Sequence, residues 1–165
     1  MKKSLAVGAL ILAVGLSGCE TTGDSGGGAP RGIQVTRTHL GQPIARGEIR
    51  VEPSTPEAVG AEFSQEEAAV GRELTRLGWT VLPAKTTTEQ VAVVRVNQTG
   101  GDRASTELRV RIQRRSDATV AWEGRAIAEA RSDSPGAARA AAVDALAAAL
   151  FRDFPGESGR TIRVR

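Results

Sequence analysis

The sequence predicts an α+β fold, an antiparallel sheet of about five to six strands with two helices packed on one face. Three observations indicate this fold. Several short stretches alternate apolar and polar residues, as half-buried strands do. Two longer stretches repeat apolar residues at helical spacing. Clusters of Gly, Pro, Ser and Asp separate them. Residues 33–165 of the 165 fit a single domain, preceded by a leader (1–18) and a Gly/Ser-rich tether (19–32).

The domain is predicted to begin with two paired strands. Residues 33–40 alternate around Ile33 and Val35, and Gly41-Gln42-Pro43 ends that run. Residues 47–52 form the second strand, and the prolines at 53 and 56 end the pairing.

The first helix carries clear end signals. Ser64 and Glu67 have the spacing of a capping box, which places the helix start at Ser64. Gly78 stands where a left-handed C-cap belongs, and Trp79 is expected to fold back into the core. The apolar face consists of Val70, Leu74 and Leu77.

Three antiparallel strands are expected next, at residues 91–97, 106–113 and 118–130, after a short strand near Val81. Gly124 lies in phase with Trp122, which indicates either a close helix approach or a bulge.

The second helix is predicted to start at Ser134-Pro135 and to end at Pro155-Gly156. A short strand at residues 160–165 follows. The helix stripe consists of Val143, Leu146, Leu150 and Phe154.

The leader ends in the segment Leu16-Ser17-Gly18-Cys19, which contains the single cysteine. Two lysines precede an apolar run at residues 5–16, the layout of a secretory signal. The run is too short for the roughly 20 residues of a spanning helix. An ordinary cleaved signal is the other alternative, but it would leave a lone free thiol in an oxidising compartment.

This segment resembles the lipobox of bacterial lipoproteins. The resemblance implies cleavage between Gly18 and Cys19, a lipid on the Cys19 thiol and acylation of the new amino terminus. Two or more acyl chains anchor a protein stably. Glu20 favours the periplasmic leaflet of the outer membrane over the inner membrane.

Three further segments resemble the bacterial lipoprotein family called domain of unknown function 4136. They are Arg72-Glu-Leu-Thr-Arg-Leu-Gly-Trp79, Thr119-Val-Ala-Trp-Glu-Gly-Arg-Ala126 and Ala142-Val-Asp-Ala-Leu-Ala-Ala-Ala-Leu-Phe-Arg-Asp-Phe-Pro155. The resemblance covers about residues 45–156 and implies neither an activity nor catalytic residues.

Composition argues against several functions. Without residues 1–18 the chain has 20 Lys and Arg against 19 Asp and Glu, a net charge of +1. Tyrosine is absent, and Trp and Phe number 2 and 3, so base stacking on nucleic acid is not expected.

No catalytic, metal or cofactor site is predicted. His39 is the single histidine, and Lys85 lacks the serine that a Ser-x-x-Lys pair needs at Leu82. Glu66 and Glu67 are explained by the start of a helix.

One surface carries a binding hypothesis. Strand parity places a set of arginines opposite the apolar face: Arg50, Arg95, Arg109, Arg111 and Arg125. Glu48, Glu52, Glu107 and Glu123 accompany them. The set is either a solvated face with cross-strand charge pairs or a surface for phosphate-rich lipid headgroups or an acidic envelope partner.

We therefore expect a non-enzymatic, lipid-anchored envelope protein, a binding or scaffold module that faces the periplasm. Its partners would be the membrane, through Cys19, and an envelope protein or lipid headgroup. The alternative is a periplasmic hydrolase using carboxylate or Ser/Thr chemistry, which the poverty of His, Lys, Tyr and Cys disfavours.

Overall fold

The computed structural model describes residues 32–56, 60–100, 105–129 and 135–164. The predicted leader, Cys19, the tether as far as residue 31 and Ser134 lie outside the described residues.

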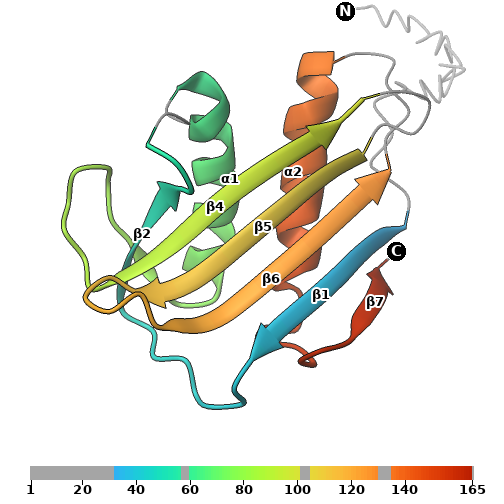
Figure 1. Ribbon diagram of the computed structural model, residues 1–165. Helices are drawn as coiled ribbons and strands as arrows, with labels where there is room; N and C mark the ends of the chain where they lie inside the picture. The colour runs from blue at the N-terminus through green and yellow to red at the C-terminus, as the bar shows by residue number, and fades with distance from the viewer. Residues whose placement is uncertain (1–31, 57–59, 101–104, 130–134, 165) are drawn as a thin grey trace, which may run out of the picture.

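A single mixed sheet of seven strands forms the front layer (Figure 1), in the order β3-β2-β4-β5-β6-β1-β7. The strands are β1 Ile33–His39, β2 Glu48–Pro53, β3 Thr80–Val81, β4 Gln90–Thr99, β5 Ser105–Arg114, β6 Val120–Glu129 and β7 Thr161–Val164. Helices α1 Ala61–Arg76 and α2 Pro135–Phe151 lie side by side behind the sheet and leave its other face open. The predicted α+β class is confirmed.

The prediction of a smaller, purely antiparallel sheet is wrong. Strand β2 pairs in parallel with both β3 and β4. Helix α1 separates β2 from these two strands along the chain, and a helical crossover brings the chain back in the same direction. The order strand, helix, strand was visible in the sequence and favours this arrangement.

The predicted pairing of the first two strands is also wrong. Strand β1 lies between β6 and β7, and three strands separate it from β2. Alternation of apolar and polar residues shows that a strand has one buried face, but it does not show which strands pair. Both partners of β1 come from the second half of the chain.

Helix α1 begins earlier than the capping box predicted. Gly60 is the N-cap and offers no side-chain cap. Ser64 lies inside the first turn, where its hydroxyl donates back to the carbonyl of Gly60 at 3.2 Å. The other end is as predicted, because Gly78 has a φ of 96° and the amide of Trp79 donates to Leu74 at 3.0 Å. Trp79 is buried.

Helix α2 ends at Phe151, before the predicted stop at Pro155-Gly156. Arg37 of β1, which is 3% exposed, donates hydrogen bonds to the carbonyls at the end of the helix. Its guanidinium donates to the carbonyls of Ala149, Leu150 and Arg152 at 3.0, 2.9 and 2.8 Å. Burial lowers the pKa of Arg37, against the charge of nearby Asp153. These bonds fix β1 to the end of α2.

The core between sheet and helices centres on Trp122 of β6. Its ring stacks on Phe151 with centroids 5.3 Å apart, and its Nε1 donates to the carbonyl of Pro155 at 3.0 Å. Phe154, in the turn after α2, packs on Trp122 and edge-on against Trp79. The register shift between β5 and β6 falls at Ile112/Gln113 and not at Gly124. Gly124 therefore marks a close approach of the helix rather than a bulge.

Gly124 is required by this packing. A Cβ there would lie against the Trp122 ring and 2.7 Å from the Leu150 Cδ1 atom of α2. We expect Gly124→Ala to lower the free energy of unfolding by about 1–3 kcal/mol, because a methyl group forces the ring or the helix outward. Denaturant unfolding measures it. Gly47→Ala, which meets nothing within 4 Å, is the matched control. Equal stability of the two variants would contradict this account.

Candidate functional site: the open face of the sheet

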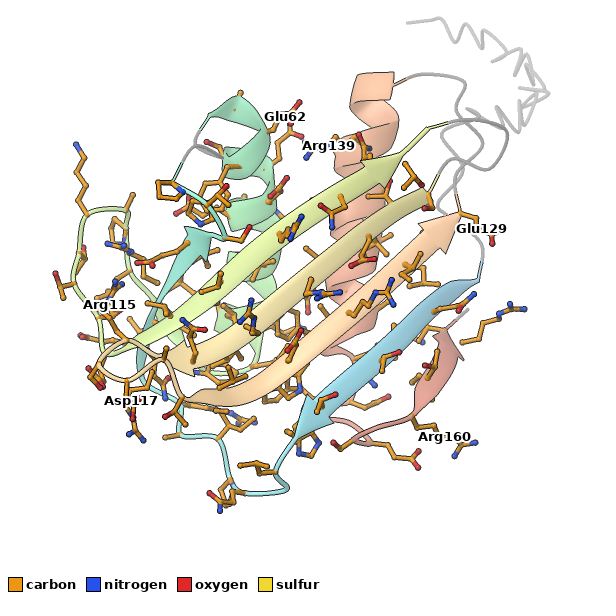
Figure 2. The ribbon with its side chains drawn as sticks, viewed as in Figure 1. Glu62, Arg115, Asp117, Glu129, Arg139 and Arg160 are labelled. Carbon is orange, nitrogen blue, oxygen red and sulfur yellow. The ribbon has the colours of Figure 1, made fainter. Side chains whose placement is uncertain are left out.

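The open face is the side of the sheet that the helices do not cover. The five arginines singled out from the sequence lie on it, because they share strand parity opposite the buried Ile49, Val94, Val110 and Trp122. Figure 2 shows polar side chains spread over this face.

Three of these arginines stand directly opposite one another on adjacent strands. Arg95 of β4 pairs in register with Arg109 of β5, and Arg109 pairs with Arg125 of β6. We call Arg95, Arg109 and Arg125 the arginine row. Like charges in directly opposite positions repel, so the row needs compensating charge.

Glu107 supplies most of that compensation. Its two oxygens accept from Arg125 at 2.7 Å and from Arg109 at 3.3 Å. The hydrogen bond from Arg125 and the charges of both arginines hold the pKa of Glu107 below its ordinary value. The same hydrogen bond raises the pKa of Arg125. Glu123 stands 3.8 Å from an Arg109 nitrogen and adds a looser contact.

Arg109 is incompletely paired. Its Nε is buried and has no hydrogen-bond partner among the described residues. A buried donor without an acceptor costs free energy, so this part of the open face carries an unmet hydrogen-bonding demand.

A shallow hollow of about 170 Å³ lies between β1, β5 and β6. It is lined by Thr36, Thr38, Arg109, Glu123 and Arg125. The threonines belong to β1, where Thr36 is in register with Arg125 and Thr38 with Glu123. The hollow therefore combines two guanidinium groups and two hydroxyls, which are donors that suit an oxyanion, with one carboxylate, which is an acceptor only.

The remaining two predicted arginines are placed differently. Arg50 of β2 pairs with Glu52 and donates to the carbonyl of Thr86 at 2.8 Å, and Arg115 also pairs with Glu52. The 82–89 loop contacts this end of the face through the carbonyls of Thr86 and Thr88, which accept from Arg50 and Arg115. Arg111 is exposed, and within the described residues it has no ion pair.

Other polar groups considered from the sequence have structural roles. His39 accepts from the Gly41 amide at 3.0 Å, and its other ring nitrogen lies 2.9 Å from the Gly156 carbonyl. Glu66 pairs with Arg139 of α2 at 2.6 Å, and burial raises its pKa. Glu62 joins that pair, and Figure 2 shows Glu62 and Arg139 facing each other between the helices.

A second groove of about 550 Å³ runs between α1 and the segment from Val81 to Pro83. Glu67 is among its lining residues, but the surface is mainly apolar. Across the described ranges, no three His, Cys, Asp or Glu side chains gather closely enough to hold a metal ion. None of the helices described is both long and apolar enough to cross a membrane.

Sequence reasoning missed Thr36 and Thr38. Their alternation with Ile33 and Val35 places them on a polar face, and that signal was available. Their position beside Arg125 depends on the pairing of β1 with β6, which no local pattern shows.

Comparisons with known proteins give limited information. No family model matches the sequence. A stretch of 64 residues, 39% of this chain, is 42% identical to an uncharacterised protein of Zymomonas mobilis. The match spans about a quarter (24%) of the length of that relative.

Solved structures are similar only at a distance. A PelC dodecamer from Paraburkholderia phytofirmans is 16% identical with a TM-score of 0.45, covering 72% of this chain and 97% of that one. A PDZ domain protein from Parabacteroides distasonis is 13% identical with a TM-score of 0.46, covering 81% and 39%. Such values carry no information on function.

The Glu107 ion pairs predict a pH dependence. The folded-state pKa of Glu107 is lowered, so these pairs stabilise the fold above the ordinary glutamate pKa of about 4.3 and lose their effect as the pH falls through the folded value. We expect the free energy of unfolding to fall more steeply below about pH 4.3 in the wild type than in Glu107→Gln. Over the whole acid range the wild type should lose on the order of 1 kcal/mol more than the variant. Denaturant unfolding between pH 6 and pH 2.5 measures the difference, with Glu157→Gln as the matched exposed control. Parallel profiles for wild type and Glu107→Gln would contradict the assignment.

Proposed function

We propose that this chain is a non-enzymatic, lipid-anchored protein of the bacterial cell envelope that faces the periplasm and acts as a binding or scaffold module. The observation that carries the proposal is the single cysteine, Cys19, at the end of a secretory leader. The resemblance to domain of unknown function 4136 supports the same location. Glu20 favours the outer membrane.

The open face is the binding surface in this proposal. It is the broad side of the sheet without helices, and it carries the arginine row. Guanidinium groups recognise carboxylates and phosphates with two parallel hydrogen bonds, so the partner is anionic.

A periplasmic hydrolase would need convergent carboxylates in a pocket. Glu66 has a raised pKa, as a general acid requires, but it lies in an ion pair between the helices. It lines neither the hollow nor the groove described above. No observation favours this second function.

Lipidation tests the location. We expect radiolabelled palmitate to be incorporated into the wild-type protein and not into Cys19→Ala, because the thiol is the site of lipid attachment. The mature mass should lack residues 1–18. Thr22→Ala, just outside the lipobox, should keep the label and the mass. Label on Cys19→Ala, or a retained leader in the wild type, would refute the proposed anchor.

Charge reversal tests the binding surface. We expect Arg109→Glu/Arg111→Glu to lose partners that in-cell crosslinking and mass spectrometry identify for the wild type, because an anionic partner is then repelled. Arg152→Glu/Arg160→Glu changes two exposed arginines in the turns between α2 and β7 and is the matched control. An unchanged set of crosslinked partners in the first variant would exclude the open face as the binding surface.

A further inference from the structure

The centre of the open face offers more guanidinium donors than acceptors. Arg95, Arg109, Arg111 and Arg125 lie there with two carboxylates, those of Glu107 and Glu123. Both Glu107 oxygens are already taken by Arg109 and Arg125. Arg95 donates to the neutral amide of Asn97 at 3.1 Å. Additional anionic acceptors would therefore complete the pairing of this surface.

The hollow is the place where such an acceptor fits. Its volume of about 170 Å³ is large enough for one tetrahedral oxyanion. Arg109 and Arg125 contribute guanidinium donors, and Thr38 contributes a hydroxyl. The Thr36 hydroxyl also lines the hollow and lies 2.7 Å from the Thr161 hydroxyl, with which it shares a hydrogen bond. A phosphate group uses both kinds of donor.

Glu123 also lines the hollow and would repel an anion. Its hold on Arg109 is loose, at 3.8 Å. Arg111 stands directly opposite Glu123 in the register of β5 and β6 and has no ion pair within the described residues. An incoming anion can therefore bind to Arg109 while Glu123 forms an ion pair with Arg111 instead. In this exchange Glu123 and Arg111 become partners, and the anion replaces Glu123 on Arg109.

The anchor brings this face within reach of a lipid surface. Thirteen residues separate Cys19 from Ile33, the first residue of β1, and even a fully extended chain of that length reaches only about 45 Å. The hollow begins at Thr36, three residues further along the same strand. The helices cover the opposite side, so the face that remains broad and charged is the one able to lie along a plane of phosphates.

We propose that the hollow binds the phosphate of an anionic phospholipid headgroup and thereby lays the open face on the leaflet that holds the lipid anchor. This inference rests on the proposed lipid anchor at Cys19. It adds an orientation, with the sheet against the bilayer and both helices directed away from it.

Fluorescence quenching in vesicles tests the orientation. Lipid occupies the native thiol of the mature protein, so one introduced cysteine can carry a fluorophore: Gln34→Cys on the open face or Ala148→Cys on the outer side of α2. The protein is reconstituted in vesicles containing headgroup nitroxide. In phosphatidylglycerol/phosphatidylcholine vesicles we expect strong quenching at position 34 and little at position 148. In pure phosphatidylcholine the two positions should differ much less.

Variants assign the effect to the arginines. Each arginine near an anionic surface contributes a factor of about five to the docking equilibrium. Arg95→Gln/Arg109→Gln should therefore lower docking by about 25-fold and bring quenching at position 34 towards the phosphatidylcholine value. Arg152→Gln/Arg160→Gln, the same charge change away from the face, should leave it unchanged. Equal quenching at positions 34 and 148 in phosphatidylglycerol would overturn the proposal.

A second arm separates lipid from free phosphate. Inorganic phosphate is added to the protein in phosphatidylcholine vesicles, and thermal stability is measured with and without the arginine changes. Stabilisation by phosphate that depends on Arg109, without quenching that depends on phosphatidylglycerol, would overturn the lipid assignment. Crosslinking of the open face to an acidic protein without such quenching would overturn it too. Failure of the anchor itself is distinct, because an unlipidated chain carries no palmitate and leaves the native thiol open to the fluorophore.

Discussion

The docking of α2 onto the sheet over Trp122 and Gly124 is the constraint on which the rest of the structure depends. The Trp122 ring occupies the space that a side chain at Gly124 would need, and it stacks on Phe151 of the helix. This contact allows α2 to come close enough to bury the apolar side chains of β5 and β6. Helix α1 closes the other half of the same face and pairs with α2 through Arg139 and Glu66. Because both helices occupy one face, the other face has to be compatible with water or with a partner.

Strand β1 links the packed side to the open side. Its residues alternate, so Arg37 points into the protein between two residues that line the hollow, Thr36 and Thr38. Arg37 is held by three carbonyls at the end of α2. A buried, multiply bonded guanidinium moves little, since any shift leaves a charge unsatisfied in the interior. The bonds between Arg37 and the end of α2 thus hold the β1 backbone that carries Thr36 and Thr38.

On the open side, electrostatics rather than packing decides the arrangement. Three arginines in register repel one another, and Glu107 offsets much of that repulsion by bridging two of them. The result is a set of guanidinium groups held in place with spare donors. Ordered donors lose less entropy when an anion binds than free side chains do. This preorganisation is the physical basis for treating the face as a binding surface.

The features that could be predicted from the amino-acid sequence are the periodic ones. Alternation located the strands and assigned Arg95, Arg109 and Arg125 to one face, and the Gly78 signal located the end of α1, because local backbone geometry and burial on one side leave a direct pattern in the chain. The neighbours of each strand, in contrast, follow from the packing of the complete fold. This packing brought β1 beside β6, made β2 and β4 parallel, and placed Arg37 of a distant strand on the carbonyls at the end of α2. These contacts join residues far apart in the chain, and their partners are selected by the packing of the whole core rather than by any local pattern.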